Sequence, residues 1–179
     1  FEYFREAFFN HNGLLASPEV EWFDVGKFLD PESSHRGFPH EWNSWRPRLS
    51  HVVDAKIGAA AGIVMGDPDV SAVTRIAKHP EVLRVSPLLG AGIAVDPRHT
   101  RTVWNTQCSA IVRELAPAML LCPQFSRYDD IIASIVAQRV MADFGYHARF
   151  GTPFTWQNRN AHDLGGVPAL REGPPDDRD

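Results

Sequence analysis

The chain has few cysteines, little excess charge and no long apolar run, and each shortage excludes a class of protein. Its 179 residues include 2 cysteines, which are too few for a disulfide scaffold, and Cys108 and Cys122 lack metal-site spacing. The net charge of -4 argues against a generic polyanion-binding surface but leaves a local basic groove open. Apolar stretches stay well short of the roughly 18 residues of a membrane span. These features predict a cytoplasmic protein in a reducing compartment.

Several catalytic signatures are also missing. The sequence has no Gly-x-Ser-x-Gly motif, phosphate-binding loop or dinucleotide-binding fingerprint. Its 8 histidines form no His-x-x-x-His pair, so a zinc hydrolase is not supported. The chain opens on Phe1 within an apolar segment, without a signal sequence, which predicts a chain cut out of a longer protein.

The remaining pattern is a mixture of helical and extended segments, which predicts an α/β fold. Apolar spacing predicts helices over 1–10, 70–78, 113–121 and 128–144. Strands are expected at 20–25, 82–85, 92–95, 103–112 and 146–150, with a buried segment at 52–65 and an aromatic-rich loop at 30–49. We therefore expect one domain over 1–162 and a flexible acidic tail, rich in Pro and Gly, over 163–179.

Two adjacent carboxylates, Asp129 and Asp130, stand at the start of the longest predicted helix. The free amides and the dipole of a helix N-terminus stabilise an ionised carboxylate, which could accept a proton from a hydroxyl or bind a cation. The alternative is that Ser126 and the two aspartates only cap the helix.

A second pair of carboxylates, Asp67 and Asp69, flanks Pro68. Two carboxylates separated by one residue can share a hard divalent metal, which can bridge to diphosphate oxygens. The alternative is a proline turn followed by Asp69 as the N-cap of the next helix.

Two polar segments with tryptophans could bind phosphate, a base or a sugar. In the first, Arg46 and Arg48 could hold phosphates while Trp42 and Trp45 stack on a base or a sugar face. In the second, Trp156 stands among amides and an arginine, a composition that suits sugar hydroxyls or phosphate. The first segment is equally consistent with a surface loop whose tryptophans plug the core, and a polar loop explains the second nearly as well.

Six short segments occur in an order that one known family shares. They span most of 36–160 and are Arg36-Gly37-Phe38-Pro39, Ser50-His51, Asp67-Pro68-Asp69, Arg113-Glu114-Leu115 with Pro117-Ala118-Met119, Arg127-Tyr128-Asp129-Asp130-Ile131, and Gly151-Thr152-Pro153. In this order they resemble the UDP-arabinopyranose mutase, or reversibly glycosylated polypeptide, family and its glycosyltransferase-like bacterial and phage relatives. The Arg-Tyr-Asp-Asp block is the most specific part of the resemblance.

The resemblance implies a GT-A type fold, a mixed sheet flanked by helices, of which this chain supplies the acceptor-side half. The nucleotide-binding half of such folds carries an Asp-x-Asp motif, and nothing before Arg36 resembles it. The implied ligands are a nucleotide-sugar donor, expected to be a UDP-sugar, a hydroxyl acceptor and a divalent cation, Mn²⁺ or Mg²⁺. The acceptor could be a sugar, a polymer or modified DNA.

The resemblance also implies roles for particular residues. Asp130 and Asp129 would be catalytic carboxylates that deprotonate the attacking hydroxyl while the metal steadies the departing diphosphate. The metal ligands are left open. The expected substrate-binding residues are Arg127, Asp67, Asp69, His51, Arg46 and Trp156.

The sequence departs from the family pattern at three positions that bear on the reaction. Cys108 stands where the family tends to have Asn, Ile132 where it tends to have Trp, and Gln157 near its late His. The Arg-Gly-Phe-Pro loop also does not align cleanly on the family's self-glycosylated arginine, and Asn43 and Arg46 both lie near that position. We therefore expect a glycosyltransferase with a separate acceptor rather than a sugar-nucleotide mutase. The alternative from a different class is a non-catalytic module that binds a nucleotide, a sugar or a protein partner.

Overall fold

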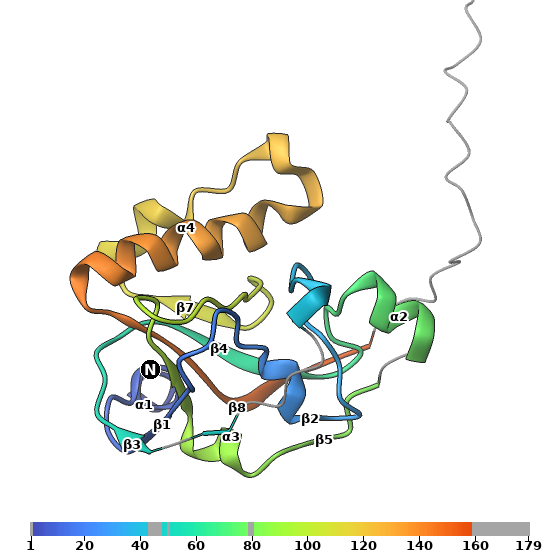
Figure 1. Ribbon diagram of the computed structural model, residues 1–179, viewed down its shortest axis with the longest axis horizontal. Coiled ribbons are helices and arrows are strands. Elements are labelled where there is room, and N and C mark those ends of the chain that lie inside the picture. The colour runs from blue at the N-terminus through green and yellow to red at the C-terminus, as the bar shows by residue number, and fades with distance from the viewer. Residues whose placement is uncertain (1, 43–47, 50, 79–80, 159–179) are drawn as a thin grey trace, which may run out of the picture.

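A computed structural model of the chain describes residues 2–42, 48–49, 51–78 and 81–158 (Figure 1). The predicted tail over 163–179 and Arg46 lie outside these residues. Within them the fold is a mixed α/β arrangement with a mixed sheet flanked by helices, as the sequence predicts.

Six strands form the main sheet. They are β1 (Leu14–Ala16), β3 (Val52–Val53), β4 (Ile57–Gly66), β6 (Ile93–Val95), β7 (Ser109–Ile111) and β8 (His147–Gln157). Their order is β3-β1-β6-β8-β4-β7, with the pairs β1/β6 and β4/β8 parallel and the other pairs antiparallel. A separate ribbon pairs β2 (Leu29–Asp30) with β5 (Arg84–Val85).

The parallel pair of β4 and β8 has the longest register in the sheet, and its end brings two polar segments together. The two strands are paired from Ile57 opposite His147 to Gly66 opposite Gln157. Because parallel strands end at the same edge, the segment after β4 and the end of β8 meet there. The amide of Asp67 donates to the carbonyl of Gln157 at 2.9 Å, so the predicted carboxylate segment begins at this edge.

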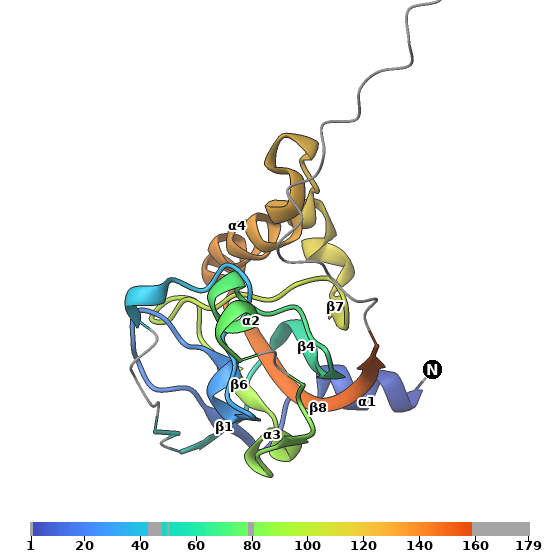
Figure 2. The same cartoon turned by 90° about the vertical axis from the view of Figure 1, so that its right-hand side faces the viewer.

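Helical segments cover both faces of the sheet (Figures 1 and 2). On one face, α4 (Asp129–Phe144) and the 3-10 segment η3 (Arg113–Met119) pack through Leu115, Ala137 and Met141 into the main core. On the other face, α1 (Glu2–Phe9) packs through Phe8 and Phe9. The remaining helical segments are η1 (Val25–Phe28), η2 (His40–Trp42), α2 (Ala72–Lys78), α3 (Leu88–Ala91) and η4 (Pro123–Tyr128).

Several predicted elements differ from the observed ones. The strand predicted over 20–25 is wrong: the side chain of Asp24 accepts a hydrogen bond from the amide of Gly26 and starts the 3-10 turn η1 instead. The helix predicted over 113–121 is the 3-10 segment η3, with Pro117 inside it. Of the strand predicted over 103–112, only β7 forms.

No helix among the described residues combines the length and the apolarity needed to span a membrane. Both cysteines are free and half-buried.

Candidate functional site

The side chain of Arg36 connects three segments that lie far apart in the sequence. Its Nε donates to Asp69 Oδ2, and its Nη2 donates to Asp130 Oδ1 at 2.8 Å and Oδ2 at 3.0 Å. Its Nη1 donates to the carbonyl of Arg127. The cluster of Arg36, Asp69 and Asp130 therefore joins the loop after β2, the segment after β4 and the start of α4. We call these three residues the ionic cluster.

The start of α4 gives Asp130 a fixed position in the ionic cluster. Asp130 is 8% exposed, and its Oδ1 also accepts the amide of Ile131 at 2.9 Å while its Oδ2 faces the amide of Thr106 at 3.4 Å. The side chain of Arg36 and the backbone amide of Ile131 therefore donate to the same carboxylate. The partial positive charge at a helix N-terminus also favours the ionised form of a carboxylate there.

Asp129 lies one residue earlier, and its side chain accepts fewer hydrogen bonds than that of Asp130. Its Oδ1 accepts the amide of Asp130 at 2.8 Å, and among the described residues none donates a hydrogen bond to its Oδ2. Ser126 does not cap this helix, because it stands at φ 51 and makes no side-chain cap bond. The expected cap role of Ser126 is therefore wrong, whereas both aspartates do accept amides of the first turn.

In the segment after β4, Asp67 and Asp69 form ion pairs with different arginines. Asp67 Oδ1 lies 2.7 Å from Nη2 of Arg75, which also donates to the carbonyl of Pro68 at 2.8 Å. Asp69 belongs to the ionic cluster. The expectation that Asp69 caps the following helix is wrong: α2 begins at Ala72, and the hydroxyl of Ser71 accepts the amide of Thr74 at 3.2 Å.

The end of β8 adds aromatic and amide groups near Asp67. The indole of Trp156 is 55% exposed and lies against the backbone of Gly66, the residue before Asp67. The side-chain amide of Gln107 donates to that of Gln157. Exposed aromatic and amide groups of this kind suit the faces and the hydroxyls of a sugar.

A neutral imidazole and a small cavity lie behind the ionic cluster. Burial lowers the pKa of His35 to about 4, against the opposing influence of the Asp69 and Asp130 carboxylates. The cavity, lined in part by His35, Asp69, Asn105 and Gln107, has a volume of about 20 Å³. That volume holds about one water molecule, so a substrate would have to bind on the outer side of the cluster.

The structure brings some of the predicted site residues together and leaves others apart. Asp67, Asp69, Asp130, Asp129 and Trp156 gather where β4, β8 and the start of α4 meet, and Arg127 contributes its carbonyl there. His51 lies beyond the β1 side of the sheet, where its carbonyl accepts the amide of Ala16 at 2.9 Å. Arg46 lies outside the described residues.

A divalent cation does not fit the carboxylates as the structure places them. Asp67 is paired with Arg75, while Asp69 and Asp130 are both paired with Arg36. Within 2–42, 48–49, 51–78 and 81–158, no three His, Cys, Asp or Glu side chains form a group that could hold a metal ion.

Sequence reasoning did not assign Arg36, Thr106 or Gln107 to the site. Arg36 carried a signal, since it opens the Arg-Gly-Phe-Pro segment of the resemblance, but nothing local indicates that it pairs with residues 33 and 94 positions away. Thr106 and Gln107 carried no signal that we can identify.

In comparisons with known proteins, no protein-family model and no curated protein matches this chain.

Proposed function

We propose that the protein is a glycosyltransferase that moves a sugar from a nucleotide diphosphate donor to a hydroxyl acceptor. The observation that supports the proposal is the ionic cluster. Three motif segments of the resemblance, Arg36-Gly37-Phe38-Pro39, Asp67-Pro68-Asp69 and the Arg-Tyr-Asp-Asp block, meet through Arg36, Asp69 and Asp130. A GT-A type fold, with this chain as its acceptor-side half, belongs to the same proposal.

Within this proposal Asp129 is the proton acceptor and Asp130 is a positioning residue. Asp130 is held by Arg36 and by backbone amides, whereas Asp129 keeps one oxygen without a described partner. That oxygen would take the proton from the acceptor hydroxyl as the hydroxyl oxygen bonds to the anomeric carbon of the sugar. The bond between that carbon and the diphosphate breaks in the same transfer, and the nucleoside diphosphate leaves. Trp156 and the amides of Gln107 and Gln157 would contact the sugar.

The divalent cation implied by the resemblance has no ligand set at this cluster, and we assign it no step here. Arg46, which lies outside the described residues, keeps its proposed role in binding phosphate, and the ligands of a cation stay open.

The experiment is an assay of UDP release from a panel of UDP-sugars by the full-length protein, with sugar alcohols and oligosaccharides as acceptors. We expect Asp129→Asn to lower kcat by about 10²- to 10⁴-fold, the usual contribution of a general base. The matched control is Asp143→Asn on the last turn of α4, where Asp143 is exposed and pairs with Arg139 at 2.6 Å. The control should leave kcat unchanged. Equal rates for Asp129→Asn and the wild type would refute the role of Asp129.

A non-catalytic module is the second candidate, because arginines pair with Asp67, Asp69 and Asp130 and the cavity beside them is small. Such a module would bind UDP or a UDP-sugar in calorimetry, but the full-length protein would release no UDP in the presence of any acceptor. A sugar-nucleotide mutase, the third candidate, would interconvert the sugar of the donor without any added acceptor.

A further inference from the structure

The guanidinium of Arg36 is surrounded by oxygen atoms from two separate parts of the chain. Asp69 contributes a carboxylate oxygen, Asp130 contributes two, and Arg127 contributes a carbonyl oxygen. Carboxylate and carbonyl oxygens that converge from different segments are also the ligands that a hard divalent cation prefers. Here the positive charge between the two carboxylates comes from the protein itself.

The side chains of the ionic cluster are largely shielded from water, so an unbalanced charge among them would destabilise the native state. The side chains of Arg36, Asp69 and Asp130 are 19%, 13% and 11% exposed. At such positions, removing one partner leaves a charge that water compensates poorly. Two carboxylates that face the same point repel each other unless a cation lies between them.

The backbone holds Arg36 in place for this role. The amide of Arg36 donates to the carbonyl of Asp69 at 3.3 Å. Gly37, at φ 82, brings the loop against Ile131 of α4, and the next residue, Phe38, is buried with Ile131. The Arg36 guanidinium also lies 5.8 Å from the centre of the Tyr128 ring, within the range of a cation–π contact.

We propose that Arg36 takes the place of a divalent cation between Asp69 and Asp130, so that this carboxylate cluster is held in position without a metal. Arg36 is thus a positioning residue that ties the start of α4 to the segment after β4. The inference rests on the geometry of the cluster and not on the proposed glycosyl transfer, so either can fail without the other.

The test uses Arg36→Gln, which removes the charge and keeps much of the side-chain length. We expect its Tm to fall by about 10 °C, because a shielded carboxylate pair has lost its cation. We expect MnCl₂ to raise the Tm of this variant, because a cation that binds the native state stabilises it. Electron paramagnetic resonance of Mn²⁺ should show one bound ion in the variant and no ion bound at these carboxylates in the wild type.

Two further variants separate the effect of the positive charge of Arg36 on the Tm from the effect of its side-chain shape. Arg36→Gln combined with Asp130→Asn removes the repulsion, so this variant should be more stable than Arg36→Gln alone and its Tm should not respond to Mn²⁺. Arg36→Lys keeps a positive charge, and its Tm should lie between those of the wild type and Arg36→Gln. If Arg36→Gln is unfolded without metal, Mn²⁺ should restore its circular dichroism spectrum.

Two results would overturn the proposal. One is a Mn²⁺-dependent rise in the wild-type Tm that Asp69→Asn abolishes, because the carboxylates would then bind the cation with Arg36 present. The other is a folded or unfolded Arg36→Gln protein that neither binds nor responds to Mn²⁺, because the place of Arg36 would then not suit a cation.

Discussion

Gly37, which follows Arg36 of the ionic cluster, stands where a side chain would meet Ile131 of α4. It has a φ of 82, a conformation that L-residues adopt at a cost, and a Cβ at this position would lie 2.5 Å from Cγ2 of Ile131. Ile131 is 2% exposed and packs with Phe38 and Val103 in a small core cluster, so it has little room to move away. Both the backbone conformation and the close approach therefore favour glycine.

We expect Gly37→Ala to lower the free energy of unfolding by about 3 kcal/mol, the sum of the left-handed conformation and the overpacking against Ile131. Gly13→Ala is the matched control, because Gly13 has a φ of 68 but nothing lies within 4 Å of the point where its methyl group would stand. Gly13→Ala should cost about 1 kcal/mol, from conformation alone. Urea denaturation measures both. Equal losses for the two variants would show that contact with Ile131 contributes nothing.

Among single residues, local sequence selected carboxylates that the structure places near one another, but it did not predict their partners. The aspartates at 67, 69, 129 and 130 could be selected because carboxylates beside a proline turn or a helix start have a restricted set of roles. The assignment of Asp69 as a cap was wrong because Arg36, 33 residues earlier, takes its carboxylate, and Ser71 caps α2 instead. Pairings of this kind depend on tertiary structure and leave no periodic trace in the sequence.

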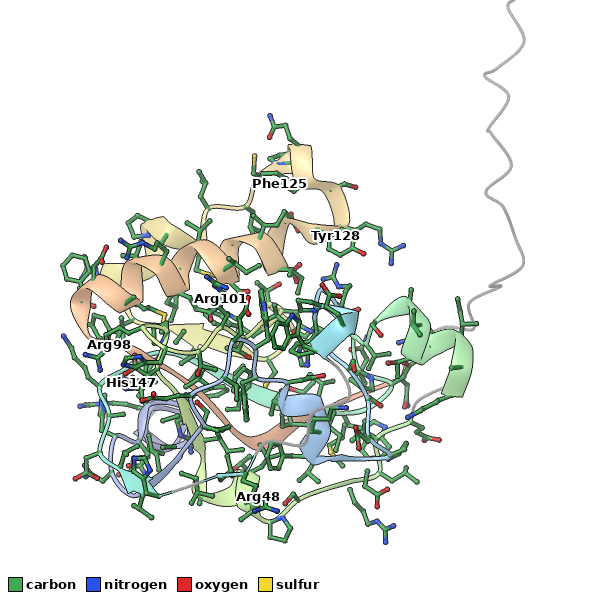
Figure 3. All side chains as sticks on the ribbon, in the orientation of Figure 1. Arg48, Arg98, Arg101, Phe125, Tyr128 and His147 are labelled. Carbon is green, nitrogen blue, oxygen red and sulfur yellow. The ribbon has the colours of Figure 1, made fainter. Side chains whose placement is uncertain are left out.

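Among the elements, α4 carries apolar side chains on its outer side as well as on its inner side. Ala137 and Met141 face the core and are fully buried, whereas Ile135, Val136 and Phe144 are exposed. The segment η4 before it projects from the molecule and carries Phe125 and Tyr128 (Figure 3). The inner face of α4 should therefore account for most of its contribution to stability.

We expect Met141→Ala to lower the free energy of unfolding by about 2–5 kcal/mol, because it opens a cavity at a fully buried position. Val136→Ala, on the exposed side of the same helix, should change it by less than about 0.5 kcal/mol. Guanidinium chloride denaturation at constant pH distinguishes the two. A cost for Val136→Ala as large as that for Met141→Ala would mean that the outer face is also covered in the native protein.

The elements that could be predicted are those with a long apolar period or clear end signals. The pattern over 128–144, closed by Gly145, predicted α4 to within one residue at its start, and the helices α1 and α2 were also predicted. The strand β1 was missed because three residues between a turn and a proline show no period. The strand predicted over 20–25 was wrong because its pairing is a single isolated bridge between Trp22 and Arg101, and the 3-10 turn η1 begins at Val25.

For the whole molecule, two groups that are shielded from water respond to pH in opposite directions. Burial raises the pKa of Asp24 to about 6. Between about pH 4 and 6 the native carboxyl keeps a proton that the unfolded chain has lost, so rising pH destabilises the native state. Burial lowers the pKa of His35 to about 4. Between about pH 4 and 6.5 the unfolded imidazole holds a proton that the native one lacks, so rising pH stabilises the native state.

We expect the two contributions to offset each other in the wild type and to separate in single variants. Relative to the wild type, Asp24→Asn should gain about 3 kcal/mol of unfolding free energy between pH 4 and 6.5, because only the His35 response remains. His35→Gln should lose a similar amount over the same interval. Urea denaturation at four pH values in this interval provides the measurement. Stability profiles parallel to that of the wild type in both variants would contradict it.

The parallel pairing of β4 with β8 also has a consequence for how the chain folds as it is synthesised. Strand β8 is the last described element, and it supplies the neighbour of both β4 and β6. Until the ribosome has released it, the alanine-rich β4 has an open edge and the sheet remains in two parts. Because Asp67 hydrogen-bonds to Gln157 at the end of β8, the surroundings of the ionic cluster are completed only at that stage. A nascent chain that stalls before this point would hold an incomplete site and an edge prone to pair with other chains.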